Sequence, residues 1–275
     1  MACAFACVVS TGATPRRVAN DVEIVGLDYA FKAPSELGSG LTSLRFRNAG
    51  KHPHELNVVQ LKRGISLEEF IAAANADKPL TPMIERVVGV LFAEPGGVSP
   101  SALTVNLVAG ATYVVQCIFK DSSKAPSHRE LGMFTSIGVS KTARARGDER
   151  PRVPVDTITG VDYAFTFPHT LAPGRHRFVF VNAGKHRHEV GLSRIKSGAS
   201  LQQLAVLEAK GGDIDALLDQ NLGVLHSRAG ESTSGMLDFD MVAGHEYLLE
   251  CGFSDTDTSP PHFKLGMFGT IRVTP

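Results

Sequence analysis

The 275-residue sequence contains no tryptophan, no excess charge of either sign and no long apolar run. Its 28 basic and 28 acidic side chains give a formal net charge of zero, so no global field favours nucleic acid or an anionic membrane surface. No stretch of about 18 apolar residues is present, which predicts no transmembrane segment. The nucleophile elbow of serine hydrolases, the phosphate-binding glycine loop and the His-Glu-x-x-His helix of metalloproteases are missing too.

Cysteine is scarce, with four in the chain. Two of them lie in residues 1–19, an apolar start rich in small residues, which we interpret as a leader or the remnant of an export signal. The segment 4–7, Ala-Phe-Ala-Cys, weakly resembles a lipoprotein cleavage site, so a lipid anchor at the N-terminus stays open. Cys117 and Cys251 lie one in each half and predict no disulfide framework. In an exported protein, periplasmic or extracellular, metal ligation is one reason for a lone thiol to stay reduced.

What the sequence does contain is an internal repeat with a constant offset of 134 residues. Asn-Ala-Gly-Lys-His at 48–52 returns at 182–186, and Leu-Gly-Met-Phe at 131–134 returns at 265–268. A constant offset means that no net insertion separates these landmarks. The two halves are therefore expected to be two copies of one fold.

The repeat divides the chain into two domains, which we place at residues 20–140 and 155–275. Each is long enough to bury a core of its own. Between them, residues 141–154 are basic, contain Pro, Arg and Gly and lack apolar periodicity, which predicts an exposed linker.

Most of each copy is predicted to form short strands separated by turns, which indicates a β-sandwich or barrel. Ser66 and Ser200 each precede a Glu or Gln three residues later, a capping box that predicts a short helical insert. A second helix is expected at residues 82–92 and at the matching 213–225. The expected strands include 44–47, 178–181, 103–108, 112–118 and one that begins near Met133.

Four side chains with metal-binding chemistry recur in the same order in both copies. Each copy has a histidine after the Asn-Ala-Gly turn, then a cysteine, a histidine after ten further residues and a methionine after four more. Two imidazoles and a thiolate suit both Cu(I) and Cu(II), and a weak axial thioether tunes the reduction potential. A lone cysteine or histidine would indicate little, but this recurrence favours metal binding.

The motifs Asn-Ala-Gly-x-x-x-His, Ala-Gly-x-x-Tyr-x-x-x-Cys and Leu-Gly-Met resemble the plastocyanin and azurin family of cupredoxins, over nearly the whole of both halves. The resemblance implies an all-β fold of two Greek-key, cupredoxin-like β-sandwich domains, each with a short helical insert. It also implies one copper per domain, two per chain. The ligands that it implies are His54, Cys117, His128 and Met133 in the first half and His188, Cys251, His262 and Met267 in the second.

Two departures from the family pattern leave alternatives open. Glu55 and Glu189 follow the first histidine where the family commonly has an asparagine that braces the copper loop, so a carboxylate could itself be a ligand. His52 and His186 are alternative first histidines. We prefer His54 and His188, which lie beside the strand, and interpret His52 and His186 as solvated loop residues rather than as second-sphere donors or an electron-exit edge.

The leading interpretation is an exported electron carrier with one mononuclear type 1-like copper site per domain and a redox partner protein. The alternatives are copper storage or delivery, a two-domain copper oxidase or nitrite-reductase-like enzyme, and a scaffold without metal. The residues that flank the cysteines, Gln116 with Ile118 and Glu250 with Gly252, are not histidines. Interdomain copper clusters of such enzymes depend on a flanking histidine, so the sequence argues against catalysis.

Overall fold

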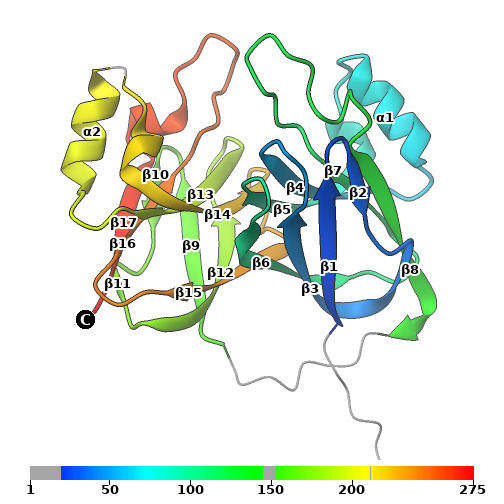
Figure 1. Cartoon of the computed structure of the whole chain (residues 1–275), viewed down its shortest axis with the longest axis horizontal. Coiled ribbons are helices and arrows are strands. Elements are labelled where there is room, and N and C mark those ends of the chain that lie inside the picture. Colours follow the sequence, from blue (N-terminus) through cyan, green and yellow to red (C-terminus); the bar gives the residue numbers. More distant parts are fainter. Residues whose placement is uncertain (1–19, 145–152, 211) are drawn as a thin grey trace, which may run out of the picture.

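The computed structural model describes residues 20–144, 153–210 and 212–275. The predicted leader and most of the predicted linker lie outside these residues. The described chain forms two similar β-rich halves that lie side by side (Figure 1). None of its helices has the length and apolar character needed to cross a membrane.

The first half has two sheets that share a long strand. One sheet pairs β1 in parallel with β3 and β3 antiparallel with β6, and the other pairs β4 with β5 and β7, and β7 with β8. The start of β3 also pairs with β8, so β3 joins the sheets. The elements are β1 (Asn20–Leu27), β2 (Ala30–Lys32), β3 (Glu36–Asn48), β4 (His54–Leu61), α1 (Leu67–Asn75), η1 (Thr81–Met83), β5 (Ile84–Ala93), β6 (Val98–Leu107), β7 (Thr112–Gln116) and β8 (Phe134–Arg144).

The second half repeats this arrangement. β9 pairs in parallel with β12 and β12 antiparallel with β15, while β13 pairs with β14 and β16, and β16 with β17. The predicted all-β sandwich class is confirmed in both halves. The elements are β9 (Val155–Val161), β10 (Ala164–Thr166), β11 (Thr170–Leu171), β12 (Gly174–Asn182), β13 (His188–Ile195), α2 (Leu201–Ala209), η2 (Ile214–Leu217), β14 (Leu218–Ser227), β15 (Gly235–Met241), β16 (Glu246–Glu250), η3 (His262–Leu265) and β17 (Phe268–Val273).

The predicted helical inserts are α1 and α2. At α1 the Ser66 hydroxyl accepts the Glu69 N–H at 3.1 Å and the Glu69 carboxylate accepts the Ser66 N–H at 2.8 Å, a complete capping box. At α2 the Ser200 hydroxyl accepts the Gln203 N–H at 3.3 Å. Each helix buries an apolar side against its own half, with Phe70 and Leu204 as its buried contacts.

The second helix predicted at 82–92 and 213–225 is wrong. Each segment begins with a short 3-10 turn and continues as a strand, β5 or β14. The run of Val87, Val88 and Val90 explains the difference, because β-branched side chains lose rotamer freedom in a helix and pack well on a sheet.

The two halves meet around a local twofold axis. β5 pairs with β14 at Val90 and Val224, and β6 pairs antiparallel with β15 at Leu103 and Leu237. In both pairs a residue faces its own counterpart in the repeat, the arrangement expected where a twofold axis crosses an antiparallel ladder. One hydrophobic core cluster therefore continues through both halves.

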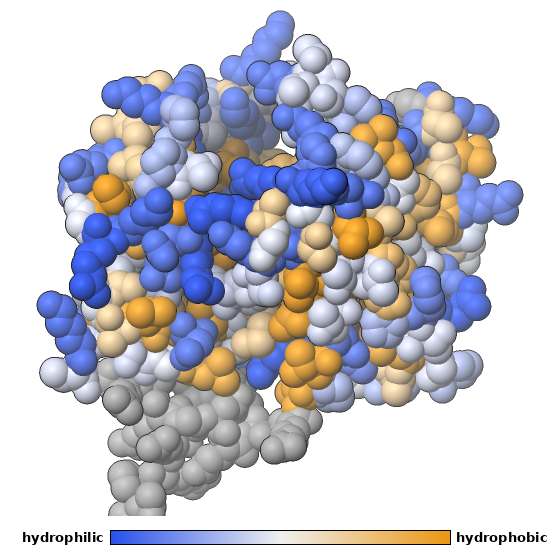
Figure 2. Space-filling view, turned by 180° about the vertical axis from the view of Figure 1, so that it is seen from behind, coloured by the Kyte–Doolittle hydropathy of each residue, from blue (hydrophilic) through white to orange (hydrophobic). Residues whose placement is uncertain are grey.

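A buried polar contact supports this junction. Asp238 accepts hydrogen bonds from the Arg177 guanidinium at 2.7 Å through both Nε and Nη2, and from the Thr104 hydroxyl at 3.0 Å. Thr104 is the repeat counterpart of Asp238. Figure 2 shows the face opposite to that of Figure 1, where hydrophilic side chains gather across the middle and apolar ones lie in smaller groups.

Gly223 lies at the contact between the halves, and its replacement tests the twofold junction. Its φ is 128°, and a Cβ atom there would lie 2.6 Å from the Val90 carbonyl oxygen of the other half. We expect Gly223→Ala to lower the free energy of unfolding by about 1–3 kcal/mol, measured by urea denaturation. Gly244→Ala is the control, because Gly244 has a φ of 75° but open surroundings. Equal losses in the two variants would mean that backbone strain alone, and not the junction, is responsible.

His226 gives the junction a pH dependence. Burial lowers its pKa from about 6.5 to about 3, and its Nδ1 accepts a hydrogen bond from Arg187 at 3.0 Å. Because the folded-state pKa lies below the unfolded one, the unfolded state takes up the proton first, and stability falls as the pH drops from about 6.5 towards 3. We expect His226→Phe, which copies the counterpart Phe92, to remove a slope of up to about 1.4 kcal/mol per pH unit. Urea denaturation at pH 7 and pH 5 measures this slope, and unchanged slopes would contradict the prediction.

Candidate metal centres

The first candidate centre lies where β4 begins and β7 ends. His54 is the first residue of β4, Cys117 follows β7, and His128 and Met133 lie in the loop that leads to β8. All four are buried, with exposures of 0–2%. In Figure 1 this loop, in green, and the equivalent orange-red loop after β16 extend to the same end of the molecule. The fold thus brings together side chains that are far apart in the sequence.

Three donor atoms form a compact triangle in this centre. His54 Nδ1 lies 2.9 Å from His128 Nδ1, and Cys117 Sγ lies 3.5 Å from His128 Nδ1 and 3.9 Å from His54 Nδ1. Such a triangle encloses a point about 2 Å from each atom, close to the roughly 2.0–2.3 Å that imidazole and thiolate donors keep from a bound transition metal such as zinc. The donors therefore fit a metal ion.

The second candidate centre has nearly the same geometry. His188 Nδ1 and His262 Nδ1 are 3.0 Å apart, and Cys251 Sγ lies 3.4 Å from His262 Nδ1 and 3.9 Å from His188 Nδ1. Met267 is fully buried and occupies the position of Met133. Within the described residues, these two His-Cys-His groups are the candidate metal clusters.

Backbone hydrogen bonds fix the loop that carries the second histidine and the methionine. The Cys117 N–H donates to the Met133 carbonyl at 3.1 Å, the Met133 N–H to the His128 carbonyl at 2.9 Å and the His128 N–H to the Phe119 carbonyl at 2.9 Å. The Met133 methyl also lies so close to Gly26 that a Cβ there would be 3.2 Å away. Met133 is therefore held beside Cys117 and His128 by main chain and packing.

Aspartates orient the two imidazoles of the first centre. Asp28 Oδ1 lies 3.4 Å from His54 Nε2, and Asp121 Oδ1 lies 3.3 Å from His128 Nε2. A carboxylate at Nε2 keeps the proton on that nitrogen, so the Nδ1 lone pair faces the cluster.

The second centre repeats both contacts. Asp162 Oδ1 lies 3.2 Å from His188 Nε2, and Asp255 Oδ1 lies 3.1 Å from His262 Nε2. The Tyr163 hydroxyl donates to the other Asp255 oxygen at 2.7 Å. The same orientation of both imidazoles is therefore imposed in each half.

The repeated Asn-Ala-Gly turn holds Asp28 in place. Asn48 Nδ2 donates to the carbonyls of His52 and Ala93 at 2.8 and 2.9 Å, which closes the turn. A Cβ at Gly50 would collide with Asp28 Oδ1 and would lie 2.8 Å from His54 Nε2. Glycine is needed there because the turn passes so close to the carboxylate–imidazole pair.

Burial keeps the thiols protonated in the absence of metal. It raises the pKa of Cys117 to about 12 and that of Cys251 to about 11. Burial also lowers the pKa of His54, and the nearby His128 adds to this effect. The lowered pKa favours the neutral, coordinating form of His54, whereas each thiol must release a proton when a metal binds.

Glu55 and Glu189 each accept a hydrogen bond from the backbone next to the cysteine of their centre. Glu55 Oε1 accepts the Ile118 N–H at 2.9 Å, and Glu189 Oε1 accepts the Gly252 N–H at 3.1 Å. Burial raises the pKa of both carboxyls to about 7. Each glutamate therefore anchors the residue after the cysteine, a bracing role that the sequence analysis had associated with the family's asparagine.

The alternative histidines lie outside the clusters. The His52 and His186 side chains are each 41% exposed, and their Nδ1 atoms contact Asp121 at 3.2 Å and Asp255 at 2.8 Å. They are not simply solvated, because each shares an aspartate with a buried histidine of its centre. This arrangement favours the second-sphere alternative over the solvated-loop interpretation that we preferred.

Sequence reasoning missed the role of the aspartates. Asp28 and Asp121 recur at the offset of 134 as Asp162 and Asp255, so the repeat carried a signal that the sequence analysis did not use. Asp28 lies in a tight turn, where Tyr29 has a φ of 65° and the Tyr29 ring centroid is 5.2 Å from that of His128.

Replacing Glu55 tests whether its carboxylate only supports the loop after Cys117 or also binds the metal. We expect Glu55→Ala to lower the free energy of unfolding by about 1–3 kcal/mol, because the Ile118 N–H loses its acceptor and a buried side chain is removed, and Glu55→Gln to lower it less. Urea denaturation measures both, with exposed Glu68→Ala as the control at within about 0.5 kcal/mol. Copper-dependent absorption should persist in both Glu55 variants. Its disappearance in Glu55→Gln would make the carboxylate a ligand.

No protein-family model and no curated protein matches the sequence. Among solved structures, a dithionite-reduced auracyanin from the photosynthetic bacterium Roseiflexus castenholzii is 20% identical, covers 45% of this chain and 98% of its own, and has a TM-score of 0.31. Auracyanin B is 26% identical, covers 46% of this chain and 94% of its own, and has a TM-score of 0.31. A multicopper oxidase is 14% identical, covers 92% of this chain and 88% of its own, and has a TM-score of 0.25. By its own strand order and its two His-Cys-His groups, the chain is a tandem pair of cupredoxin-like domains.

Proposed function

We propose that the protein transfers single electrons through one mononuclear type 1-like copper site in each half. The observation that carries this proposal is the pair of buried, pre-formed donor triangles, each with a buried methionine in the loop that carries its second histidine. The proposed ligands are His54, Cys117, His128 and Met133 for one copper and His188, Cys251, His262 and Met267 for the other. We also propose domain boundaries at residues 20–140 and 155–275.

The donor set explains the choice of metal. Thiolate and thioether ligands favour copper over hard cations, and two imidazoles with a thiolate suit both of its oxidation states. Copper bound there would supply reversible one-electron chemistry. The chain's contribution is rigidity: the aspartates fix the imidazoles, the loop hydrogen bonds fix Cys117 and Met133, and burial excludes water, so little has to move when the charge changes.

Electrons would enter or leave through the loop end of each half. The His128 side chain has no exposed surface. The partly exposed ring of His52 lies close to it, with 6.2 Å between the two ring centroids. Leu131, in the same loop, is 45% exposed, as is its counterpart Leu265. An exposed apolar side chain in the loop that carries a buried ligand is suited to brief contact with a redox partner protein. We propose that this partner acts outside the cytoplasm, where a lone thiol is retained as a ligand.

The same geometry bears on the alternatives. Copper delivery requires ligands that a receiving protein can reach, whereas these ligands are at most 2% exposed. A copper oxidase or nitrite-reductase-like enzyme would require a further metal between the halves, and no histidine flanks Cys117 or Cys251 to supply it. Electron transfer accounts better for the burial.

Copper titration of the cysteine variants tests the proposal. We expect the wild-type chain to bind two equivalents of Cu(II) with intense thiolate-to-copper absorption. Cys117→Ser and Cys251→Ser should each lose the charge-transfer absorption of one site and keep that of the other, because each half supplies its own thiolate. Visible absorption and EPR follow the titration. A wild-type chain that remains colourless, or a variant that loses both sites, would contradict two independent centres.

A further inference from the structure

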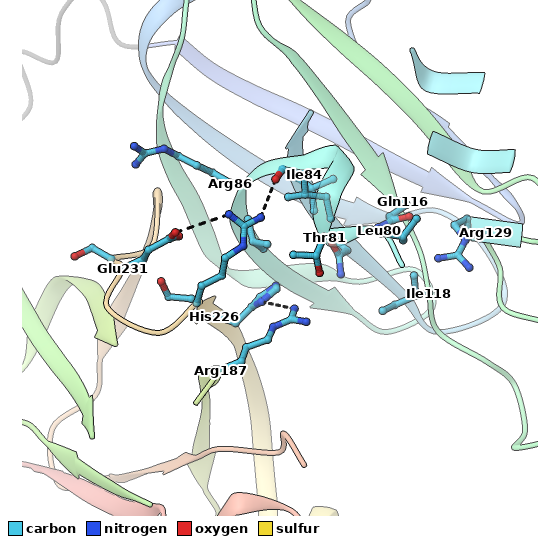
Figure 3. A pocket seen from close by; sticks show the side chains of 16 residues that line it. Leu80, Thr81, Ile84, Arg86, Gln116, Ile118, Arg129, Arg187, His226 and Glu231 are labelled. Atoms are coloured by element: carbon cyan, nitrogen blue, oxygen red, sulfur yellow. Dashed lines mark hydrogen bonds and ion pairs between the residues drawn. The ribbon is translucent and has the colours of Figure 1, made fainter. Parts of the chain in front are cut away.

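The local twofold axis creates two interdomain pockets that differ in charge. One, which we call the arginine pocket, has a volume of about 380 Å³ and is lined by β4, β5 and β7 of the first half and by the end of β14 and neighbouring loops of the second. The other has a volume of about 510 Å³ and is lined by β13 and β14 of the second half and by the ends of β4, β5 and β6 and neighbouring loops of the first. Four arginines line the first pocket: Arg86, Arg129, Arg187 and Arg228 (Figure 3).

The charge of the arginine pocket is not a requirement of the fold. At an offset of 134, its arginines correspond to Gln220, Phe263, Pro53 and Glu94, none of which is basic. The charged residues that line the second pocket are all acidic: Glu94, Asp215 and Asp219. The two copies thus keep the same metal-centre residues but differ at these positions.

Three of the four arginines, Arg86, Arg129 and Arg187, form no ion pair within the described residues. Arg228 donates to the Ile84 carbonyl at 2.7 Å and lies 3.8 Å from Glu231, the one acidic residue that lines the pocket. Arg129 donates to the Ala74 carbonyl at 3.3 Å, and Arg187 donates to His226 Nδ1 at 3.0 Å. Figure 3 shows them entering the pocket from different sides, from the loop after β7 and from the turn before β13.

Polar atoms beside these arginines are also unsatisfied. Arg129 Nε, Gln116 Oε1 and Asn57 Oδ1 are buried and have no hydrogen-bond partner among the described residues. Asn57 and Gln116 face each other across β4 and β7, and both line the pocket with Arg129. A buried polar group without a partner costs free energy, so this cluster indicates a ligand site. Arg129 Nε is a donor that an oxyanion can satisfy, whereas Gln116 Oε1 and Asn57 Oδ1 are acceptors that would take a donor group of the same ligand.

We propose that the arginine pocket binds a small organic anion whose carboxylate or phosphate group is held by guanidinium groups of the pocket, among them those of Arg129 and Arg187. Guanidinium groups recognise these oxyanions through charge-assisted hydrogen bonds. The pocket is larger than an inorganic oxyanion needs, and Leu80 and Ile84 offer apolar contacts for the rest of the molecule. Because both halves line the pocket, the bound ligand would contact both halves.

Calorimetric titration of the purified full-length chain tests the proposal at low ionic strength. Phenyl phosphate and benzoate are the probes, because each combines an anionic group with an apolar body. We expect 1:1 binding of at least one of them, at least 10-fold tighter than that of inorganic phosphate. Binding of phenyl phosphate no tighter than that of inorganic phosphate, together with no binding of benzoate, would overturn the organic occupant.

Variants assign the binding to the pocket. Arg129→Gln and Arg187→Gln should each weaken binding by about 10-fold or more, as expected for loss of a hydrogen bond to a charged group. Arg175→Gln is the control, because Arg175 does not line the pocket and its guanidinium contacts Asp240 at 3.4 Å. The affinity of this variant for the probes should equal that of the wild-type chain. Circular dichroism verifies that each variant is folded. No saturable binding by the wild-type chain, or equal loss in Arg175→Gln, would overturn the proposal.

Discussion

The organisation of each half depends on holding two imidazole Nδ1 atoms about 3 Å apart beside a buried thiol. Such a group is costly to bury, because polar atoms removed from water must find partners. The chain provides them at the rear of each ring, where Asp28 and Asp121, or Asp162 and Asp255, accept the Nε2 protons. The Asn-Ala-Gly turn, the Asp-Tyr turn and the loop after the cysteine all converge on this requirement, which explains why these segments recur in both halves.

The local twofold axis is the second organising feature. Val90 with Val224 and Leu103 with Leu237 place equivalent residues opposite each other, so the core continues from one half into the next. The tandem repeat therefore has the arrangement of a symmetric dimer within one chain. The pockets beside this axis differ in charge between the two copies.

The sequence predicted the sandwich class, the helical inserts and the grouping of the buried histidines with Cys117 and Cys251, because all three are expressed in local patterns or in the repeat. It did not predict the strands β5 and β14, because the pairing with β4 and β13 that stabilises them is not visible in the local sequence. It also missed the carboxylates behind the imidazoles. Asp121 is seven residues from His128 but Asp28 is 26 residues from His54, and only the folded chain shows that they contact the same centre.

Because the two copies are covalently linked in one chain, a substitution in one copy is not repeated in the other. In a dimer of identical chains, every substitution appears twice, so a basic pocket on one side of the axis requires a basic pocket on the other. In a single chain, Arg228 and its counterpart Glu94 mutate independently. The single chain can therefore keep two equivalent metal centres and still carry one basic and one acidic pocket. A symmetric dimer cannot have this difference between its two sides.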